Sequence, residues 1–326
     1  MHIFNYVLKD KKDISLIFKQ NFPTGTTCFF DIETTGLNRA NNSVYLIGFL
    51  YFDANSLQWT ITQCFAESID EEKQILQWTN NFISNFKTLI TFNGESFDIP
   101  FIKYRMDKYG IKNNFDKLSS FDIYKEVKKH HSYLNFKNYR LKTIEENLGI
   151  YREDKLSGKE CINLYFKYMR NKEKDLVDKI LKHNYDDLYY LIDILKIFDN
   201  IYAAKSFHVQ KDNDLIEIQI EDIFCDGDMF NIYCKTSTSN NIAYYGEHFN
   251  IRWEDKRLFI NFEYRKGMIT PTKECLFIDV SSWDIKDKLK DLSEYLSPEN
   301  VILLKVEDIY EIYNIKNIVE KLILVI

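Results

Sequence analysis

Two acidic residues, Asp31 and Glu33, stand one residue apart at the end of an apolar run that begins at Phe29. In a β-strand, side chains at i and i+2 point to the same face, so these two carboxylates project together while Ile32 enters the core. Paired carboxylates repel each other unless a cation lies between them, and hard oxygen ligands suit Mg²⁺ or Mn²⁺. This pattern alone fits a strand end with two solvated acids equally well.

A third acidic residue, Asp98, follows another apolar segment. Residues 88–92 have the pattern of a strand, and Pro100 suits the first turn of a helix because its missing N–H is not needed there. Asp98 is therefore expected at the start of a helix, near the carboxyl end of a strand. Ligands bind at that edge in open α/β sheets.

A fourth acidic residue is expected on the helix from about Lys174 to Asn200. At ~100° per residue its apolar side chains form an arc centred on Leu188. Asp187 lies ~100° from that centre, at the margin of the apolar face, and Asp186 lies ~160° away, where it should face water. Asp187 is therefore the candidate ligand of the two.

Two further residues of this helix have an expected place. His183 is one turn before Asp187, so the two are i,i+4 neighbours. Asn184 falls on the apolar arc and is expected to form a buried hydrogen bond with a structural role.

The elements around these residues alternate between strands and helices. Residues 1–25 contain short segments of mixed pattern, with a turn near Pro23. A helix is expected over residues 70–86, with Asp70 as its N-cap. Strands are expected at 26–33, 44–52, 59–66 and 88–92, and further helices at 101–110, 122–130, 141–148 and 158–170. This order predicts an α/β fold with a sheet flanked by helices.

The character of the chain changes after about residue 200. From Asp214 onward, short alternating segments predict a smaller β-rich C-terminal domain. We expect a first domain over residues 1–204 and a second over residues 205–326.

Composition describes a globular protein. Of the 326 residues, 45% are hydrophobic and 28% are charged, and no apolar run approaches the ~20 residues of a membrane span. The six cysteines show no C-x-x-C spacing, and the N-terminus lacks a signal-peptide pattern, so cytoplasmic localisation is expected. The net charge of −6 argues against a broad nonspecific nucleic-acid coat but does not exclude a nuclease, since bound cations supply positive charge locally.

Taken together, these acidic motifs resemble those of the RNase H-like 3′–5′ exonucleases, whose site holds four carboxylates. Residues 31–37 (DIETTGL) match their first motif. Residues 93–100 (NGESFDIP) resemble the second motif of family B DNA polymerase proofreading domains, and residues 183–187 (HNYDD) occupy the third. Residues 141–150, 156–158 and 183–184 are similar to the bacterial YprB-type RNase H-like group. The resemblance covers about residues 26–200.

This resemblance implies an RNase H-like mixed sheet and a metal-dependent phosphodiester hydrolase. Two Mg²⁺ or Mn²⁺ ions would be held by carboxylates, with Asp31 bridging both, Glu33 and Asp187 completing one site and Asp98 helping to hold the other. It implies hydrolysis at the 3′ end of single-stranded DNA or RNA, with release of nucleoside monophosphates. The candidate substrate contacts are Thr34, Thr35, Gly36, Leu37, Asn93 and Phe97. For Leu37 and Phe97, core packing is an open alternative.

One position departs from the relatives. They carry either a Tyr four residues before the last Asp or a His five residues before it, whereas His183 lies four before Asp187. A neutral imidazole near pH 7 can act as a general base, and a helix-face His that only bonds locally is the alternative.

Two other functions remain open at this point. The chain could be a nucleic-acid-binding or scaffolding module that kept the fold without turnover, or a structure-specific endonuclease. An unused acidic cluster is costly without metal, which argues against the module without turnover. The second domain could position substrate or bind a partner protein, and its sequence favours neither role.

Overall fold

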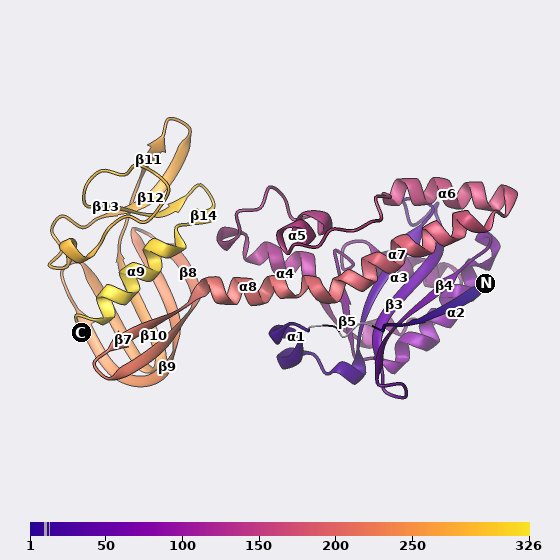
Figure 1. Ribbon diagram of the computed structural model, residues 1–326, viewed down its shortest axis with the longest axis horizontal. Coiled ribbons are helices and arrows are strands. Elements are labelled where there is room, and N and C mark those ends of the chain that lie inside the picture. The colour runs from indigo at the N-terminus through magenta and orange to yellow at the C-terminus, as the bar shows by residue number, and fades with distance from the viewer. Residues whose placement is uncertain (10–11, 13) are drawn as a thin grey trace. The chain divides into compact units, whose positions relative to one another are not determined.

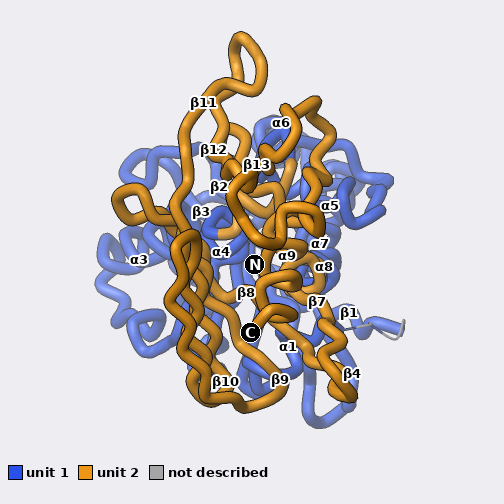
Figure 2. Tube along the Cα trace, turned by 90° about the vertical axis from the view of Figure 1, so that its left-hand side faces the viewer, with its two compact units in different colours: residues 1–129, 136–199 blue, residues 130–135, 200–326 orange. Residues whose placement is uncertain are grey.

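The computed structural model describes residues 1–9, 12 and 14–326 and divides into two compact units (Figure 2). Unit 1 comprises residues 1–129 and 136–199, and unit 2 comprises residues 130–135 and 200–326. The units divide at Asp199/Asn200, and the domain boundary at 204/205 stays a prediction.

Unit 1 is built on a six-stranded mixed sheet in the order β1-β4-β3-β2-β5-β6 (Figure 1). Strands β1 to β4 pair antiparallel, whereas β5 and β6 run parallel to β2. The strands are β1 (His2–Val7), β2 (Thr27–Thr34), β3 (Val44–Asp53), β4 (Gln58–Phe65), β5 (Thr88–Thr91) and β6 (Ser119–Asp122). This mixed sheet confirms the predicted α/β class.

Eight helices of the described chain connect or extend this sheet. They are α1 (Leu16–Asn21), α2 (Glu72–Phe82), α3 (Asp98–Lys108), α4 (Ile123–Lys129), α5 (Leu141–Asn147), α6 (Gly158–Asn171), α7 (Lys174–Ile194) and α8 (Lys196–Lys205). The single helix expected over 174–200 is thus α7 followed by α8. The N-cap of α2 is Glu71 and not Asp70, because a 3₁₀ turn over Ile69–Glu71 comes first. Strands β1 and β6 were not predicted.

The two faces of β2 have different neighbours. Phe30 packs on Phe49 of β3 and on Phe115, and Phe49 contacts Trp78 of α2. Asp31 lies on the opposite face, where it contacts α7. The alternation of the strand therefore directs Phe30 away from α7 and Asp31 toward it.

Helix α7 approaches the sheet closely at Gly48, which pairs with Asp31 across β2 and β3. A Cβ at Gly48 would lie 2.3 Å from Asn184 Oδ1 and 2.5 Å from Leu188 Cδ1, both on α7. Only a glycine leaves room for the helix at this distance from the strand.

The loop after β5 is fixed by Asp122, at the end of β6. Its carboxylate accepts hydrogen bonds from the backbone N–H groups of Asn93 (2.8 Å), Glu95 (3.0 Å) and Tyr124 (3.1 Å). Asn93 adopts a positive φ of 62°. These bonds set the path of the chain into α3 and so the position of Asp98, the first residue of that helix.

Unit 2 is rich in β-structure, as predicted. Its two antiparallel sheets have the orders β10-β9-β8-β7 and β11-β12-β13-β14, and α9 (Ile312–Ile323) packs on their shared core. The strands are β7 (Ser206–Lys211), β8 (Asp214–Asp226), β9 (Met229–Tyr245), β10 (Phe249–Glu263), β11 (Arg265–Thr270), β12 (Lys273–Asp279), β13 (Val301–Val306) and β14 (Ile309–Tyr310). Across residues 1–9, 12 and 14–326, every helix is too short or too polar to cross a membrane.

The close approach at Gly48 yields a first prediction. Gly48→Ala should destabilise unit 1 by about 1–3 kcal/mol, because the added methyl group overlaps Asn184 and Leu188. Native-state hydrogen exchange at the amides of β2 and β3 measures this loss. Gly158→Ala is the matched control, since nothing lies within 4 Å of a Cβ there. An unchanged exchange rate in Gly48→Ala would mean that α7 does not need this approach.

Candidate metal centre

Three carboxylates converge where β2 meets α7. Asp31, Glu33 and Asp187 each offer a carboxylate oxygen, and these atoms all lie within 4.8 Å of one another. Asp31 and Glu33 come from β2, and Asp187 comes from α7, more than 150 residues later. The fold thus joins the first and third sequence motifs at one point.

Asp31 is held in place by a chain of amide groups. Asn184 Nδ2 donates to Asp31 Oδ2 at 2.7 Å, and Gln63 Nε2 donates to Asn184 Oδ1 at 2.7 Å. Gln63 Nε2 also donates to the backbone carbonyl of Leu181 at 3.0 Å. The buried hydrogen bonds expected of Asn184 are present, and they orient the acid at the centre of the group.

Asp98 lies beside this group without joining it. Its Oδ1 accepts a hydrogen bond from the backbone N–H of Ile32 at 3.2 Å, so the carboxylate lies against β2 between the two acids of the first motif. Among the described residues, Asp98 is not within the 4.8 Å group. It also contributes to the electrostatic repulsion on both Asp31 and Glu33.

The acids disfavour one another's ionisation. Burial raises the pKa of Asp31 well above its usual value, and the charges of Asp187, Asp98 and Glu33 raise it further. Burial likewise raises the pKa of Asp98 to about 7 and that of Glu33 to about 8. The group therefore holds protons near neutral pH unless cations compensate its charge.

The donor set fits a hard divalent cation. Carboxylate oxygens are the ligands that Mg²⁺ and Mn²⁺ prefer, and buried acids of raised pKa gain most from a bound positive charge. Asp31, Glu33, Asp98 and Asp187 are thus the residues that would hold such ions.

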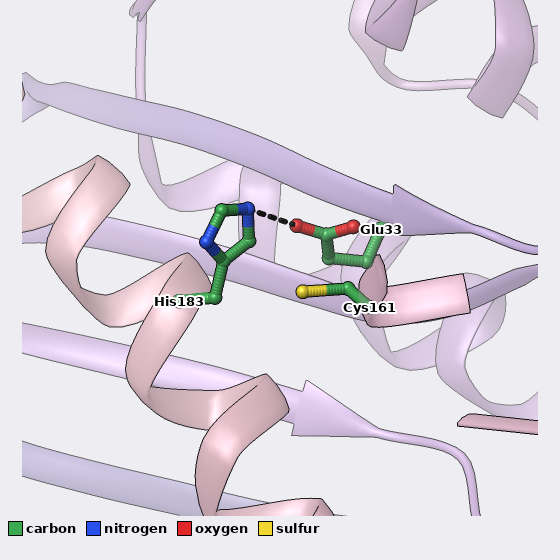
Figure 3. Close-up of side chains that lie close together, drawn as sticks. All are labelled: Glu33, Cys161 and His183. Carbon is green, nitrogen blue, oxygen red and sulfur yellow. Dashed lines mark ion pairs between the residues drawn. The ribbon is translucent and has the colours of Figure 1, made fainter. Parts of the chain in front are cut away.

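A second group of possible ligands, Glu33, Cys161 and His183, lies next to the first (Figure 3). Burial raises the pKa of the Cys161 thiol far above neutral pH, so the thiolate that a soft metal requires is disfavoured. His183 Nε2 lies 3.7 Å from Glu33 Oε1 and faces the carboxylates. A cation at this place would therefore suit the oxygen ligands better than the thiol.

His183 is oriented by an acid that sequence analysis missed, Asp154. Its Oδ2 lies 2.6 Å from His183 Nδ1, and both side chains are nearly buried. This bond leaves Nε2 directed at Glu33 and at Asp187, whose Oδ2 is 3.6 Å away. Burial lowers the pKa of His183, but the charges of Asp187, Glu33 and Asp154 outweigh it and raise the pKa overall.

Arg152, which sequence analysis also missed, is a cation beside the site. Its guanidinium pairs with Asp187 and with Glu145 of α5, and it lies 5.3 Å from the centre of the Tyr190 ring. Arg152 thus offsets the charge of Asp187. Asp154 and Arg152 lie in the segment between α5 and α6, where neither periodicity nor a motif marks them.

The predicted substrate residues of the first motif form a turn after β2. Thr34 Oγ1 donates to the Gly36 carbonyl at 2.9 Å, and the Thr35 hydroxyl accepts from the Ser43 N–H at 2.9 Å. Both threonines are buried, whereas Leu37 is 83% exposed. Core packing, the alternative for Leu37, is therefore wrong, and its role in substrate binding stays a prediction.

The two candidates near the second motif differ in their surroundings. Phe97 is half-buried and packs on Phe101 with ring centres 5.5 Å apart, so part of its surface belongs to the core. Asn93 uses its backbone N–H to bond Asp122, and its side chain is partly exposed. A contact of either residue with substrate stays a prediction.

The expectation that Asp186 faces water is wrong. Asp186 is only 2% exposed and pairs with Lys182 at 2.6 Å, while Asp187 is partly exposed and turns to the carboxylate group. The helical projection considered only the face of α7 against the sheet. The segment that carries Arg152 and Asp154 contributes charges beside Asp186 on its other side.

The raised pKa values yield a second prediction. Glu33 and Asp98 bind protons more tightly in the native state than in the unfolded chain, so without metal the stability should fall as pH rises from about 5 to about 8. The expected loss is on the order of 4 kcal/mol, and Mn²⁺ should reverse it. Scanning calorimetry in EDTA and in Mn²⁺ measures both effects.

Asp31→Asn should reduce this pH dependence because it removes one of the mutually repelling charges. Asp70→Asn, at an exposed acid outside the site, is the control and should behave as the unaltered chain. A stability that is independent of pH in EDTA would contradict the electrostatic description of the group.

Comparison with known proteins agrees with this architecture. Over 194 residues the chain is 31% identical to the uncharacterized protein YprB of Bacillus subtilis strain 168, a match that covers 54% of this chain and 44% of that protein. The match thus spans less than half of that relative's length. It confirms the resemblance to YprB that the motifs indicated.

Comparison with solved structures finds likenesses to a DNA polymerase and an exonuclease, among others. The family B DNA polymerase of Pyrobaculum calidifontis is 13% identical, with 56% of this chain and 25% of that chain covered and a TM-score of 0.42. A zinc-bound complex of E. coli exonuclease I with single-stranded DNA is 13% identical, with 64% and 54% covered and a TM-score of 0.33. Likenesses at these scores do not bear on function.

The family assignment comes from the sequence itself. The family described as the RNase H superfamily matches residues 28–198, which begin in β2 and end in α8 and include all four candidate acids. The match covers more than half of the 326 residues. The chain belongs to the RNase H superfamily.

Proposed function

We propose that this chain is a divalent-metal-dependent 3′–5′ exonuclease that hydrolyses phosphodiester bonds at the ends of single-stranded DNA or RNA. The observation that carries this proposal is the convergence of Asp31, Glu33 and Asp187 within 4.8 Å, with Asp98 hydrogen-bonded to the strand between the first two. The motif resemblance described above supports the 3′–5′ direction.

The four acids would hold Mg²⁺ or Mn²⁺, with Asp31 at the centre of the group. Two such ions would stabilise the attacking and leaving oxygens of a phosphodiester during an in-line displacement. The chain itself contributes the fixed position of these acids. Asn184 and Gln63 hold Asp31, and the Ile32 N–H holds Asp98, so the ligands need little rearrangement.

His183 would accept a proton at Nε2 from the water that attacks the phosphodiester. Asp154 fixes Nδ1, so the free nitrogen faces Glu33 and Asp187, beside the reacting group. Cations on these two acids would offset two of the three charges that raise the pKa of His183, while burial, which lowers it, would remain. A neutral imidazole is the form that a general base requires.

The turn after β2 and the loop after β5 would contact the terminal nucleotide. Leu37 is exposed and apolar, which suits contact with a base, and the backbone of Thr34, Thr35 and Gly36 is held rigid by its own hydrogen bonds. Asn93 and Phe97 would contact the substrate from the loop that leads into α3.

The third prediction tests the reaction directly. Asp31→Asn should lower cleavage about a thousandfold, because it weakens binding of cations whose charge stabilisation is several kcal/mol. End-labelled single strands of matched DNA and RNA, incubated with Mn²⁺, measure the rate and the product size. Asp186→Asn is the matched control and should retain activity, since its carboxylate pairs with Lys182 outside the group.

The products separate the candidate functions. Mononucleotides support the exonuclease, internal fragments indicate an endonuclease, and binding of intact substrate indicates a module without turnover. Equal rates for Asp31→Asn and the unaltered chain would refute the site.

The fourth prediction concerns Asp154 as a positioning residue. Asp154→Asn should lower kcat about 10- to 100-fold with little change in KM, because the imidazole loses the partner that orients it. The acid limb of the kcat profile should move to lower pH, since the lost charge had raised the pKa of His183. In a His183→Ala background the same substitution should have no further effect. An additional loss in that background would show that Asp154 acts independently of the imidazole.

A further inference from the structure

A basic stretch of the chain stands out against its acidic composition. Residues 127–144 contain five Lys and Arg and no Asp or Glu, although the whole chain has a net charge of −6. Two aromatic residues, Phe136 and Tyr139, directly precede the cations Lys137 and Arg140. Cations interleaved with aromatic residues are typical of surfaces that bind single-stranded nucleic acid.

Three of these cations gather where the stretch enters α5. Lys137, Arg140 and Lys142 are exposed, and within the described parts of the chain their side chains form no ion pair. The backbone that carries them is ordered, because the Asn138 side chain accepts from the Arg140 N–H at 3.0 Å and from the Thr143 hydroxyl at 2.7 Å. The cations are therefore available to an external anion.

A cavity of about 360 Å³ continues from this point to the candidate metal centre. Residues of α5, of the segment before α6 and of α7 line it, among them Lys142 of α5 and His183 and Asp187 of α7. Lys155 adds a second cation without an ion pair among the described residues, and Tyr151, 79% exposed, adds an aromatic ring. Leu141, Ile150 and Leu156 supply apolar surface.

The chemistry of this lining suits one unpaired nucleotide. Its volume is near the lower end of the ~300–1,000 Å³ of ligand pockets. The lysines match a phosphate, and the exposed ring and apolar side chains match the face of a base. The acids of the lining other than Glu146 are engaged: Glu145 with Arg152, Asp154 with His183, and Asp187 with Arg152.

We propose that this cavity is a nucleotide subsite next to the metal centre, and that Lys137, Arg140 and Lys142 bind the phosphates of the single strand that leads to it. This inference rests on the proposed function, since it assigns a path for the substrate of that site. It adds a binding surface on α5 and on the segment before α6, on residues outside the acidic motifs.

Direct binding tests the proposal without requiring turnover. The protein carries Asp31→Asn to prevent cleavage, and anisotropy of 5′-fluorescein dT12 in Mg²⁺ reports Kd over a series of salt concentrations. Replacing Lys137, Arg140 and Lys142 together by serine should weaken binding about 100-fold at 0.1 M salt. The slope of log K against log salt should fall by about 2, at ~0.7 per phosphate contact.

The matched control removes three other cations, Lys73, Lys108 and Lys112. They are exposed, form no ion pair among the described residues, and lie outside the cavity, and their replacement by serine changes the net charge equally. The control should bind dT12 as the parent does. An equal loss in both triple variants would mean that only net charge matters and would overturn the proposed path.

A separate substitution tests the subsite itself. Tyr151→Ala should weaken dT12 binding about tenfold through the lost stacking on a base, with no change in the salt slope. Unchanged affinity, together with equally tight binding of poly-aspartate, would identify the surface as a docking site for acidic protein and overturn the nucleotide assignment.

The two proposals fail in different ways. The unaltered chain could cleave no substrate while the variant with serine at positions 137, 140 and 142 still loses dT12 binding. The exonuclease proposal would then be wrong and the strand path would stand. If the unaltered chain cleaves single strands and the cation-replaced variant binds them equally well, the strand path is wrong and the exonuclease proposal stands.

Discussion

Electrostatic repulsion among clustered carboxylates is the constraint on which unit 1 depends. Asp31, Glu33 and Asp187 lie within 4.8 Å of one another, and burial together with their charges raises the pKa of both Asp31 and Glu33. Such a group destabilises the native state at neutral pH unless it binds protons or cations. The rest of the unit must therefore supply enough packing to hold acids that would otherwise separate.

That packing comes from the contact between β3 and α7. Gly48 leaves space for Asn184 and Leu188 directly opposite Asp31, so the helix can lie against the strand. Asn184 then performs two tasks, since it accepts from Gln63 and donates to Asp31. The same close approach that buries the apolar face of α7 also brings Asp187 to the first motif. Fold and site therefore share one interface.

The difference between local patterns and tertiary contacts explains how much of the site the sequence could predict. Strand alternation predicted that Asp31 and Glu33 share a face, and the phase of one helix predicted that Asp187 reaches the margin of the apolar side. Both patterns are local and periodic. Asp154 escaped prediction because it lies in an irregular segment, where its meeting with the imidazole depends on tertiary structure alone. Asp186 was wrongly expected at the surface because a helical projection takes account of one packing partner, and α7 has a second.

The irregular segment before α6 has more influence on the site than its lack of pattern suggests. Arg152 brings a positive charge to Asp187, and two residues later Asp154 brings a negative charge to His183. The two effects have opposite sign, and they act on two residues one turn apart on α7. A shift of this one segment would therefore weaken the compensation of Asp187 and the orientation of the imidazole together. The acidic motifs determine which atoms can hold a cation, and this segment determines the charge and orientation of the groups beside them.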